Sequence, residues 1–200
     1  MFTEPDWKGR ASVEGSTVSV GPGTVIRENV IINLPAKNDV TVIGSNCYLM
    51  NTCFVGHDCI VGNNVTLCPH ACVAGNVVIG DYTTLGMNSS IHQGSVIGKC
   101  CMIGAGSFFK GTSPDGITWA GVPATPIKVN TVGIERSGLT DAEKKEMISN
   151  AQLFVDGFES SGDVEAKSWI TPSNKKTRNI ILNSIRCFKF SNIFNGKLRK

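Results

Sequence analysis

The stretch VIGDYTTLGMNSSIHQGSVIG, residues 78–98, repeats one pattern every six residues. Each unit has an aliphatic residue, usually followed by glycine, and a small residue stands two positions before the next aliphatic residue. The aliphatic position holds through eleven successive units, at Ile43, Leu49, Val55, Val61, Leu67, Val73, Ile79, Leu85, Ile91, Ile97 and Ile103. The small position holds only cysteine, serine, threonine, alanine or valine from Cys47 to Ser107.

This period excludes the two ordinary elements, because an α-helix repeats every 3.6 residues and a flat strand every two. A triangular coil explains it: each hexad forms one flat side, three hexads complete a turn, and each turn rises by about 4.8 Å, one strand spacing. The same register appears upstream at Val20, Ile26 and Ile32, and one residue of phase is lost within LPAKNDVT, residues 34–41. We therefore expect a loop at 34–41 that projects from a corner of the coil.

The coil pattern ends in GVPA, residues 121–124, and helical patterns follow it. Thr140 and Glu143 form a capping-box signature, after which apolar residues recur at helical spacing. A second amphipathic stretch covers residues 176–190. We expect an all-β coil domain over residues 1–130, which carries the loop at 34–41. A C-terminal α-helical region with packing helices would follow over residues 131–200.

The composition, 41% hydrophobic and 18% charged over 200 residues, is that of a globular chain. It has no apolar run of roughly 18 residues and no basic leader before an apolar segment, so we expect a cytoplasmic protein without an integral membrane segment. Residues 175–200 hold eight Lys or Arg and no Asp or Glu. This basic tail could dock an acidic carrier protein, touch a membrane or form a solvated face, and no nucleic-acid partner is expected.

The segment NTCFVGHDCIVGNN, residues 51–64, crowds cysteine, histidine and aspartate together, which suggests a metal site, a thiol nucleophile or a single histidine base. Four cysteines fall on the inward small position of their hexads: Cys47, Cys53, Cys59 and Cys101. His57 falls on an outward turn position, so inward and outward side chains would have to converge on a metal, and no C-x-x-C pair is present. We expect no metal site and interpret these cysteines as small hydrophobic residues.

The chain has three histidines, which can be weighed singly. His70 follows Pro69 at a corner and is expected to be structural. His57, beside Asp58, is either a solvated corner residue or a general base. A histidine has an ordinary pKa near neutrality, which suits a general base, and an adjacent carboxylate could hold its tautomer. The coil period places further candidates on the same edge as His57, namely Gly75, Asn76, His92 and Gln93.

Five segments carry a resemblance to a known family, in the order IRENVIIN, IGSNCYLM, GHDCIVGNN, LGMNSSIHQ and ATPIKVNTVGIERSG. The hexads resemble the left-handed parallel β-helix of hexapeptide-repeat acyltransferases, and these segments are similar to the UDP-N-acetylglucosamine O-acyltransferases of the lipid A pathway. The similarity covers roughly residues 4–158. It implies a homotrimer with sites between subunits, an acyl-carrier-protein thioester as acyl donor, a nucleotide-sugar acceptor and no bound cofactor.

The resemblance also implies roles for single residues. His57 falls on the family's catalytic base, Gly75 on the backbone N–H that faces the thioester carbonyl, and Gln93 follows His92 in the family's HQ pair. PDWKG near the start matches an Asp-x-Lys that touches the acceptor sugar, so Asp6 and Lys8 are expected to bind it. Two further positions lie near the nucleotide in the family and match Asn130 and Arg136.

The chain departs from the family at Phe54 and Asn76, where the family has histidine, and at Val132, where it has an acid. The chain begins near the Asp-x-Lys, so from the resemblance we expect it to lack about the first three turns of the family's coil. Ala105 stands where the family often has glycine beside the acyl groove, which favours a shorter acyl chain. Two alternatives therefore stay open: an acetyl-CoA-dependent N-acetyltransferase of a nucleotide-linked amino sugar, and a non-catalytic β-helix with a binding or structural role.

Overall fold

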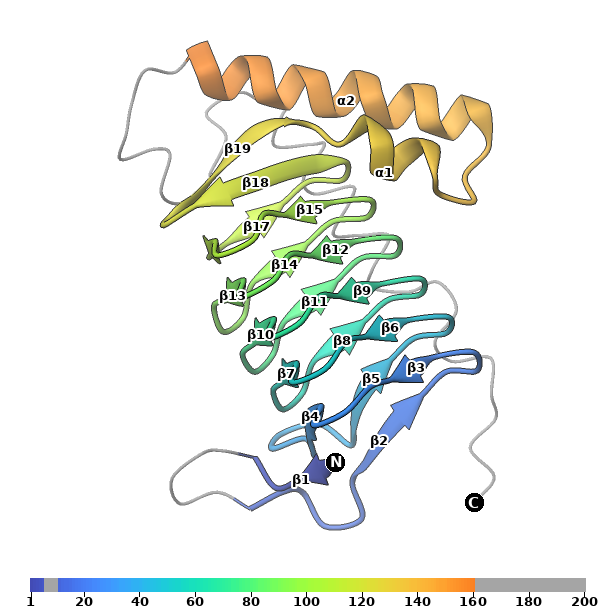
Figure 1. Cartoon of the computed structure of the whole chain (residues 1–200), viewed down its shortest axis with the longest axis vertical. Helices are drawn as coiled ribbons and strands as arrows, with labels where there is room; N and C mark the ends of the chain where they lie inside the picture. The colour runs from blue at the N-terminus through green and yellow to red at the C-terminus, as the bar shows by residue number, and fades with distance from the viewer. Residues whose placement is uncertain (6–10, 161–200) are drawn as a thin grey trace.

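The computed structural model describes residues 1–5 and 11–160 and shows a three-sided coil of short strands beneath a long helix (Figure 1). The strands of the first side are β1 (Phe2–Thr3), β4 (Ile31–Asn33), β7 (Phe54–Val55), β10 (Cys72–Val73), β13 (Ser90–Ile91) and β16 (Phe108–Phe109). Those of the second are β2 (Thr17–Val20), β5 (Val40–Ile43), β8 (Ile60–Val61), β11 (Val78–Ile79), β14 (Val96–Ile97) and β17 (Thr112–Ser113). Those of the third are β3 (Val25–Ile26), β6 (Tyr48–Leu49), β9 (Thr66–Leu67), β12 (Thr84–Leu85), β15 (Met102–Ile103), β18 (Ile117–Gly121) and β19 (Ala124–Val129).

Neighbouring strands within each side are parallel and one coil turn apart. On the first side, Val55 pairs with Val73 and Val73 with Ile91, so equivalent residues of successive turns stack on each other. Only β18 and β19, among the described strands, pair in the antiparallel sense. The parallel coil predicted from the hexads is confirmed.

The aliphatic position of each hexad fills the coil interior. From Ile43 to Ile103 its residues are at most 2% exposed. The small position is buried with it, and its thiols bond across the corner to the next turn: the Cys59 Sγ donates to the carbonyl of Ala74 at 3.0 Å, and the Cys47 Sγ to that of Gly62 at 3.0 Å. The prediction that these cysteines are small inward residues is confirmed.

The N-terminal end of the register differs from the expectation. Ile26 is in phase with the interior positions, yet it is 37% exposed. It lies on β3, the last strand of its sheet, so no further described strand stacks beneath it. Hydrophobic phase alone therefore does not bury a residue of this coil, because burial also needs a turn on each side.

Two helices follow the strands, α1 (Thr131–Glu135) and α2 (Asp141–Ser160), and α2 lies across the end of the coil (Figure 1). The capping box is present: the Thr140 N–H donates to Glu143 Oε2 at 2.8 Å, and the Glu143 N–H donates to Thr140 Oγ1 at 3.4 Å. Phe154 of α2 is buried, with its ring 6.1 Å from that of Trp119. The C-terminal helical extension is confirmed, whereas the division into domains at residue 130 stays a prediction.

No helix in the described ranges is long and apolar enough to cross a membrane. The second amphipathic stretch, residues 176–190, and the basic tail, residues 175–200, lie outside the described residues.

Candidate functional site

His57 and Asp58 lie on the corner between β7 and β8. Only 8% of His57 is exposed, so the alternative of a solvated corner residue is wrong. The imidazole Nδ1 lies 2.6 Å from Asp58 Oδ2, and the Asp58 side chain is fully buried. A carboxylate at this distance favours a proton on Nδ1, which leaves Nε2 as a proton acceptor.

Asp58 takes the left-handed conformation, with φ 60°, and its carboxylate turns towards the loop between β4 and β5. Three backbone N–H groups of that loop donate to it, from Ala36, Lys37 and Asn38. Burial by itself raises the pKa of Asp58, but the hydrogen bonds from His57 and the three N–H groups outweigh it and hold the pKa below its ordinary value. The carboxylate is therefore ionised at neutral pH.

Gly75 lies one turn above His57, since Val55 pairs with Val73. A Cβ at Gly75 would overlap the His57 imidazole, and Nε2 would be the nearest atom. Glycine is thus required here for close approach, and it brings the backbone of residue 75 to the Nε2 side of the ring.

The N–H of Gly75 differs from its equivalents on another corner. At the same hexad position, the N–H groups of Ser45, Asn63 and Lys99 each donate to a side-chain oxygen of the next turn, at 2.7–2.8 Å. The residue above Gly75 is Gln93, and the Gly75 N–H has no hydrogen-bond acceptor among the described residues, although Gly75 is buried. A buried donor beside a histidine Nε2 suits a developing oxyanion.

The other edge candidates stack above these residues. Asn76 is half-buried, and its N–H donates to the His57 carbonyl at 2.8 Å. Gln93 is exposed and lies one turn above Gly75, since Val73 pairs with Ile91. His92 is half-buried, with its Nδ1 3.0 Å from the Gln93 carbonyl and its ring edge-on to Phe108. The structure thus places Asn76, His92 and Gln93 along the edge that His57 and Gly75 occupy.

Asn130 and Arg136 lie elsewhere in the chain. The Asn130 side chain donates to the Cys100 carbonyl at 2.8 Å and accepts from the Gly133 N–H at the start of α1. Cys100 belongs to the corner between β14 and β15, which is not the corner of His57. Arg136 is exposed at the end of α1. Asp6 and Lys8 lie outside the described residues.

Sequence reasoning missed the groups that hold Asp58. Thr41 is fully buried, and its Oγ1 accepts the Asp58 N–H at 3.0 Å. The N–H groups of residues 36–38 act through the backbone, so no residue type marks them. The one-residue shift of the hexad register within residues 34–41 was the only sequence signal of these groups. It predicts a loop at this corner, but it does not say where the loop packs.

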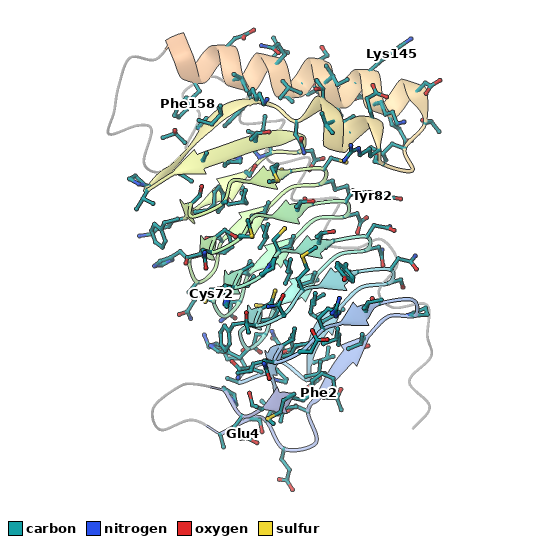
Figure 2. All side chains as sticks on the ribbon, in the orientation of Figure 1. Phe2, Glu4, Cys72, Tyr82, Lys145 and Phe158 are labelled. Carbon is teal, nitrogen blue, oxygen red and sulfur yellow. The ribbon has the colours of Figure 1, made fainter. Side chains whose placement is uncertain are left out.

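The cysteines near the site are poor nucleophiles. Burial raises the pKa of the Cys59 thiol to about 12 and that of Cys53 to about 11. Cys72, by contrast, is exposed on the outer face of the coil (Figure 2). Within residues 1–5 and 11–160 no group of three His, Cys, Asp or Glu side chains is placed to hold a metal ion.

Comparison with known proteins agrees with this fold. The family model described as bacterial transferase hexapeptide, six repeats, matches residues 41–75 and 76–111. The six-residue repeat and the left-handed parallel β-helix fold predicted from the sequence are therefore confirmed, and over these residues the chain is similar to hexapeptide transferases.

Individual curated relatives give a more specific comparison than the family model. An acyl-[acyl-carrier-protein]–UDP-N-acetylglucosamine O-acyltransferase of Burkholderia orbicola is 36% identical over 129 residues, which cover 64% of this chain and 49% of the relative. The enzyme of the same name from Campylobacter concisus is 36% identical over 141 residues, 69% of this chain and 53% of the relative. The chain spans about half the length of the curated relatives it matches.

Solved structures give the same result. A UDP-N-acetylglucosamine acyltransferase from Bacteroides fragilis superimposes with a TM-score of 0.73 at 27% identity, covering 92% of this chain and 72% of that one. The enzyme from Campylobacter jejuni gives 0.70 at 28% identity, with 90% and 73% covered. The resemblance to the UDP-N-acetylglucosamine O-acyltransferases, stated from the sequence, is confirmed.

Proposed function

We propose that this chain is an acyltransferase that moves an acyl group from a thioester to a hydroxyl of a UDP-linked sugar, with His57 as general base. The main support for the proposal is the arrangement of groups around the His57 imidazole. Asp58 holds Nδ1 at 2.6 Å, and Nε2 faces the backbone of Gly75, whose buried N–H has no acceptor among the described residues. A base and an oxyanion donor are the two groups that direct acyl transfer needs.

The mechanism follows from these positions. Nε2 takes the proton of the acceptor hydroxyl as its oxygen attacks the thioester carbonyl, and Asp58 stabilises the imidazolium that results. The N–H of Gly75 donates to the oxyanion of the tetrahedral intermediate. Collapse then breaks the carbon–sulfur bond, and the departing thiolate receives the proton from His57. No covalent enzyme intermediate is needed.

The printed names of the relatives support an acyl-carrier-protein thioester as donor and UDP-N-acetylglucosamine as acceptor. We propose Asn76, His92 and Gln93 as substrate contacts along the edge, Asp6 and Lys8 as contacts to the sugar, and Asn130 and Arg136 as contacts to the nucleotide. An acetyl-CoA donor, N-acylation, a cytoplasmic location and a docking role for the basic tail stay predictions.

A homotrimer is part of this proposal. The outer face of the second side carries one aliphatic residue per turn next to the His57 corner, and all four are only half-buried: Val42, Ile60, Val78 and Val96. Such a row favours burial against another copy, and a neighbouring chain could then bring a different corner, such as that of Asn130, to the His57 edge. Light scattering on the purified chain tests this, and a monomer at micromolar concentration would contradict it.

The decisive experiment offers UDP-N-acetylglucosamine with acyl-carrier-protein thioesters of several lengths and with acetyl-CoA, and identifies products by mass spectrometry. His57→Ala should lower turnover at least roughly 100-fold without changing the melting temperature by more than a few degrees. His70→Ala is the matched control, since His70 is exposed and its Nδ1 contacts Thr52 Oγ1 on another corner. Unchanged turnover in His57→Ala refutes the base, and absence of any product or nucleotide-sugar binding favours a non-catalytic β-helix.

A further inference from the structure

The loop of residues 34–39 joins β4 to β5, and three of its backbone N–H groups contact Asp58, which lies beside the candidate base. The Asn38 N–H donates to Asp58 Oδ1 at 2.7 Å, the Lys37 N–H to Oδ1 at 3.1 Å and the Ala36 N–H to Oδ2 at 3.1 Å. The loop is tied to the N-terminal segment at both ends, because the Pro35 carbonyl accepts the Val13 N–H and the Asp39 carbonyl accepts the Thr17 N–H.

These contacts leave Asp58 little freedom. Both carboxylate oxygens accept at least one loop N–H, and Oδ2 is also the atom that contacts His57 Nδ1. An ionised carboxylate accepts on both oxygens, whereas a protonated acid or an amide would present a hydrogen to one of these donors. Hydrogen bonds to an ionised group are the strong ones, and here they act on a side chain with no exposed surface.

Without the loop, little would fix the orientation of the Asp58 carboxylate relative to His57. Asp58 follows a residue that stands on an outward position, and its φ of 60° is shared by other corner residues of the coil, such as Asn64 and Asn76, so the backbone alone does not direct the carboxylate. The loop supplies what the corner lacks, since three converging N–H groups fix the plane of the carboxylate and hence the line along which it meets His57.

We propose that residues 36–38 form a backbone positioning device for the general base: their N–H groups orient Asp58, and Asp58 fixes the tautomer and direction of the His57 ring. The inference rests on the proposed function for its kinetic consequence, but the orientation of the ring can be measured without substrate. It assigns a role in the reaction to the backbone N–H groups of this loop. Side-chain changes in the loop should therefore matter less than loss of an N–H.

Proline substitution removes an N–H and so provides the test. Asn38→Pro removes the N–H that makes the shortest of the three hydrogen bonds to Asp58, and Lys37→Pro removes a second N–H. Ser45→Pro is the matched control, because it deletes an N–H that donates to the Asn63 side chain at 2.8 Å on a different corner. The coil accepts proline at this hexad position, as Pro22 and Pro69 occupy its equivalents.

We expect Asn38→Pro and Lys37→Pro to lower kcat by roughly 10- to 100-fold with KM within about twofold, as for other groups that orient a functional side chain. Ser45→Pro should keep the wild-type kcat. Nitrogen-15 spectra of the histidine side chains, with His70 and His92 as internal references, should show a single Nδ1–H tautomer for His57 in the wild type and in Ser45→Pro. Exchange between tautomers should appear in the loop variants.

Three outcomes overturn the inference. A loop variant with wild-type kcat and an unchanged His57 spectrum shows that the N–H groups do not position the base. Equal losses in the loop variants and in Ser45→Pro point to general destabilisation. If neither loop variant gives a cooperative melting transition, the loop is a folding element and not a positioning one. If the wild type transfers no acyl group, the proposed function fails, while the spectra still decide whether the loop orients His57.

Discussion

Replacing Gly75 with alanine should abolish most turnover although it adds one methyl group and keeps the backbone N–H. The new Cβ would lie within 3.0 Å of three ring atoms of His57, with Nε2 the nearest. The ring cannot easily retreat, because Nδ1 is held at 2.6 Å by a carboxylate that is itself fixed by three loop N–H groups. Either the His57 ring moves away from Asp58, or the coil turn that carries residue 75 shifts.

The size of the effect follows from this geometry. The φ of Gly75 is not in the left-handed region, so the alanine variant loses stability only through overpacking, about 1–3 kcal/mol. A displaced imidazole loses most of its value as a base, and general bases contribute roughly 100- to 10,000-fold. We therefore expect turnover to fall at least roughly 100-fold while the coil stays folded.

The assay compares kcat and melting temperature with those of Gly106→Ala. Gly106 has φ 67° and open space where its Cβ would be, so its variant should lose about 1–2 kcal/mol of stability from backbone strain and keep its activity. Turnover of Gly75→Ala within twofold of wild type would refute the reasoning, because it would mean that nothing happens on the Gly75 side of the ring.

Three further changes have measurable outcomes. The pKa of Asp58 is lowered in the folded chain, so its contribution to the unfolding free energy is complete above the ordinary pKa of about 3.9 and is lost as the pH falls through the lowered pKa. In urea unfolding from pH 7 to 3, the difference in unfolding free energy between wild type and Asp58→Asn should therefore shrink towards acid, and a constant difference would contradict this. Thr140→Ala removes the Oγ1 acceptor of the capping box and should lower the unfolding free energy by about 1 kcal/mol without affecting turnover; a loss of activity would indicate that α2 does more than pack. At pH 8 iodoacetamide should label exposed Cys72 before buried Cys59, whose pKa is about 12, and mass spectrometry showing equal rates would mean that the coil opens readily.

The fold was predictable because its information is local and repeated. An aliphatic residue at every sixth position from Ile43 to Ile103 can only be buried together if the chain coils with three hexads per turn. The exposed Ile26 marks where this reasoning ends, since the sequence pattern does not say whether another turn lies beneath. The helix that follows was predictable from its capping box for the same local reason.

The site was predictable only as far as the coil period extends. The period places His57, Gly75 and Gln93 on one edge, as the strand register shows. The orientation of Asp58, however, depends on a loop more than fifteen residues earlier, and the N–H groups that contact the carboxylate leave no trace in residue type. Asn130 could likewise not be recognised from its sequence neighbourhood as a residue that ties α1 to Cys100.

The stacked register of the coil has a consequence for how the distance between the His57 corner and the α2 cap can change. Each turn adds one strand of about 4.8 Å along the axis and returns every corner to the same direction. Inserting or deleting one whole turn above Gly75 would therefore translate the cap relative to the base by one fixed step without rotating it. In this architecture a length along the axis is set in units of a turn, so a chain of this kind can be lengthened or shortened above the His57 corner while the corner itself is left unchanged.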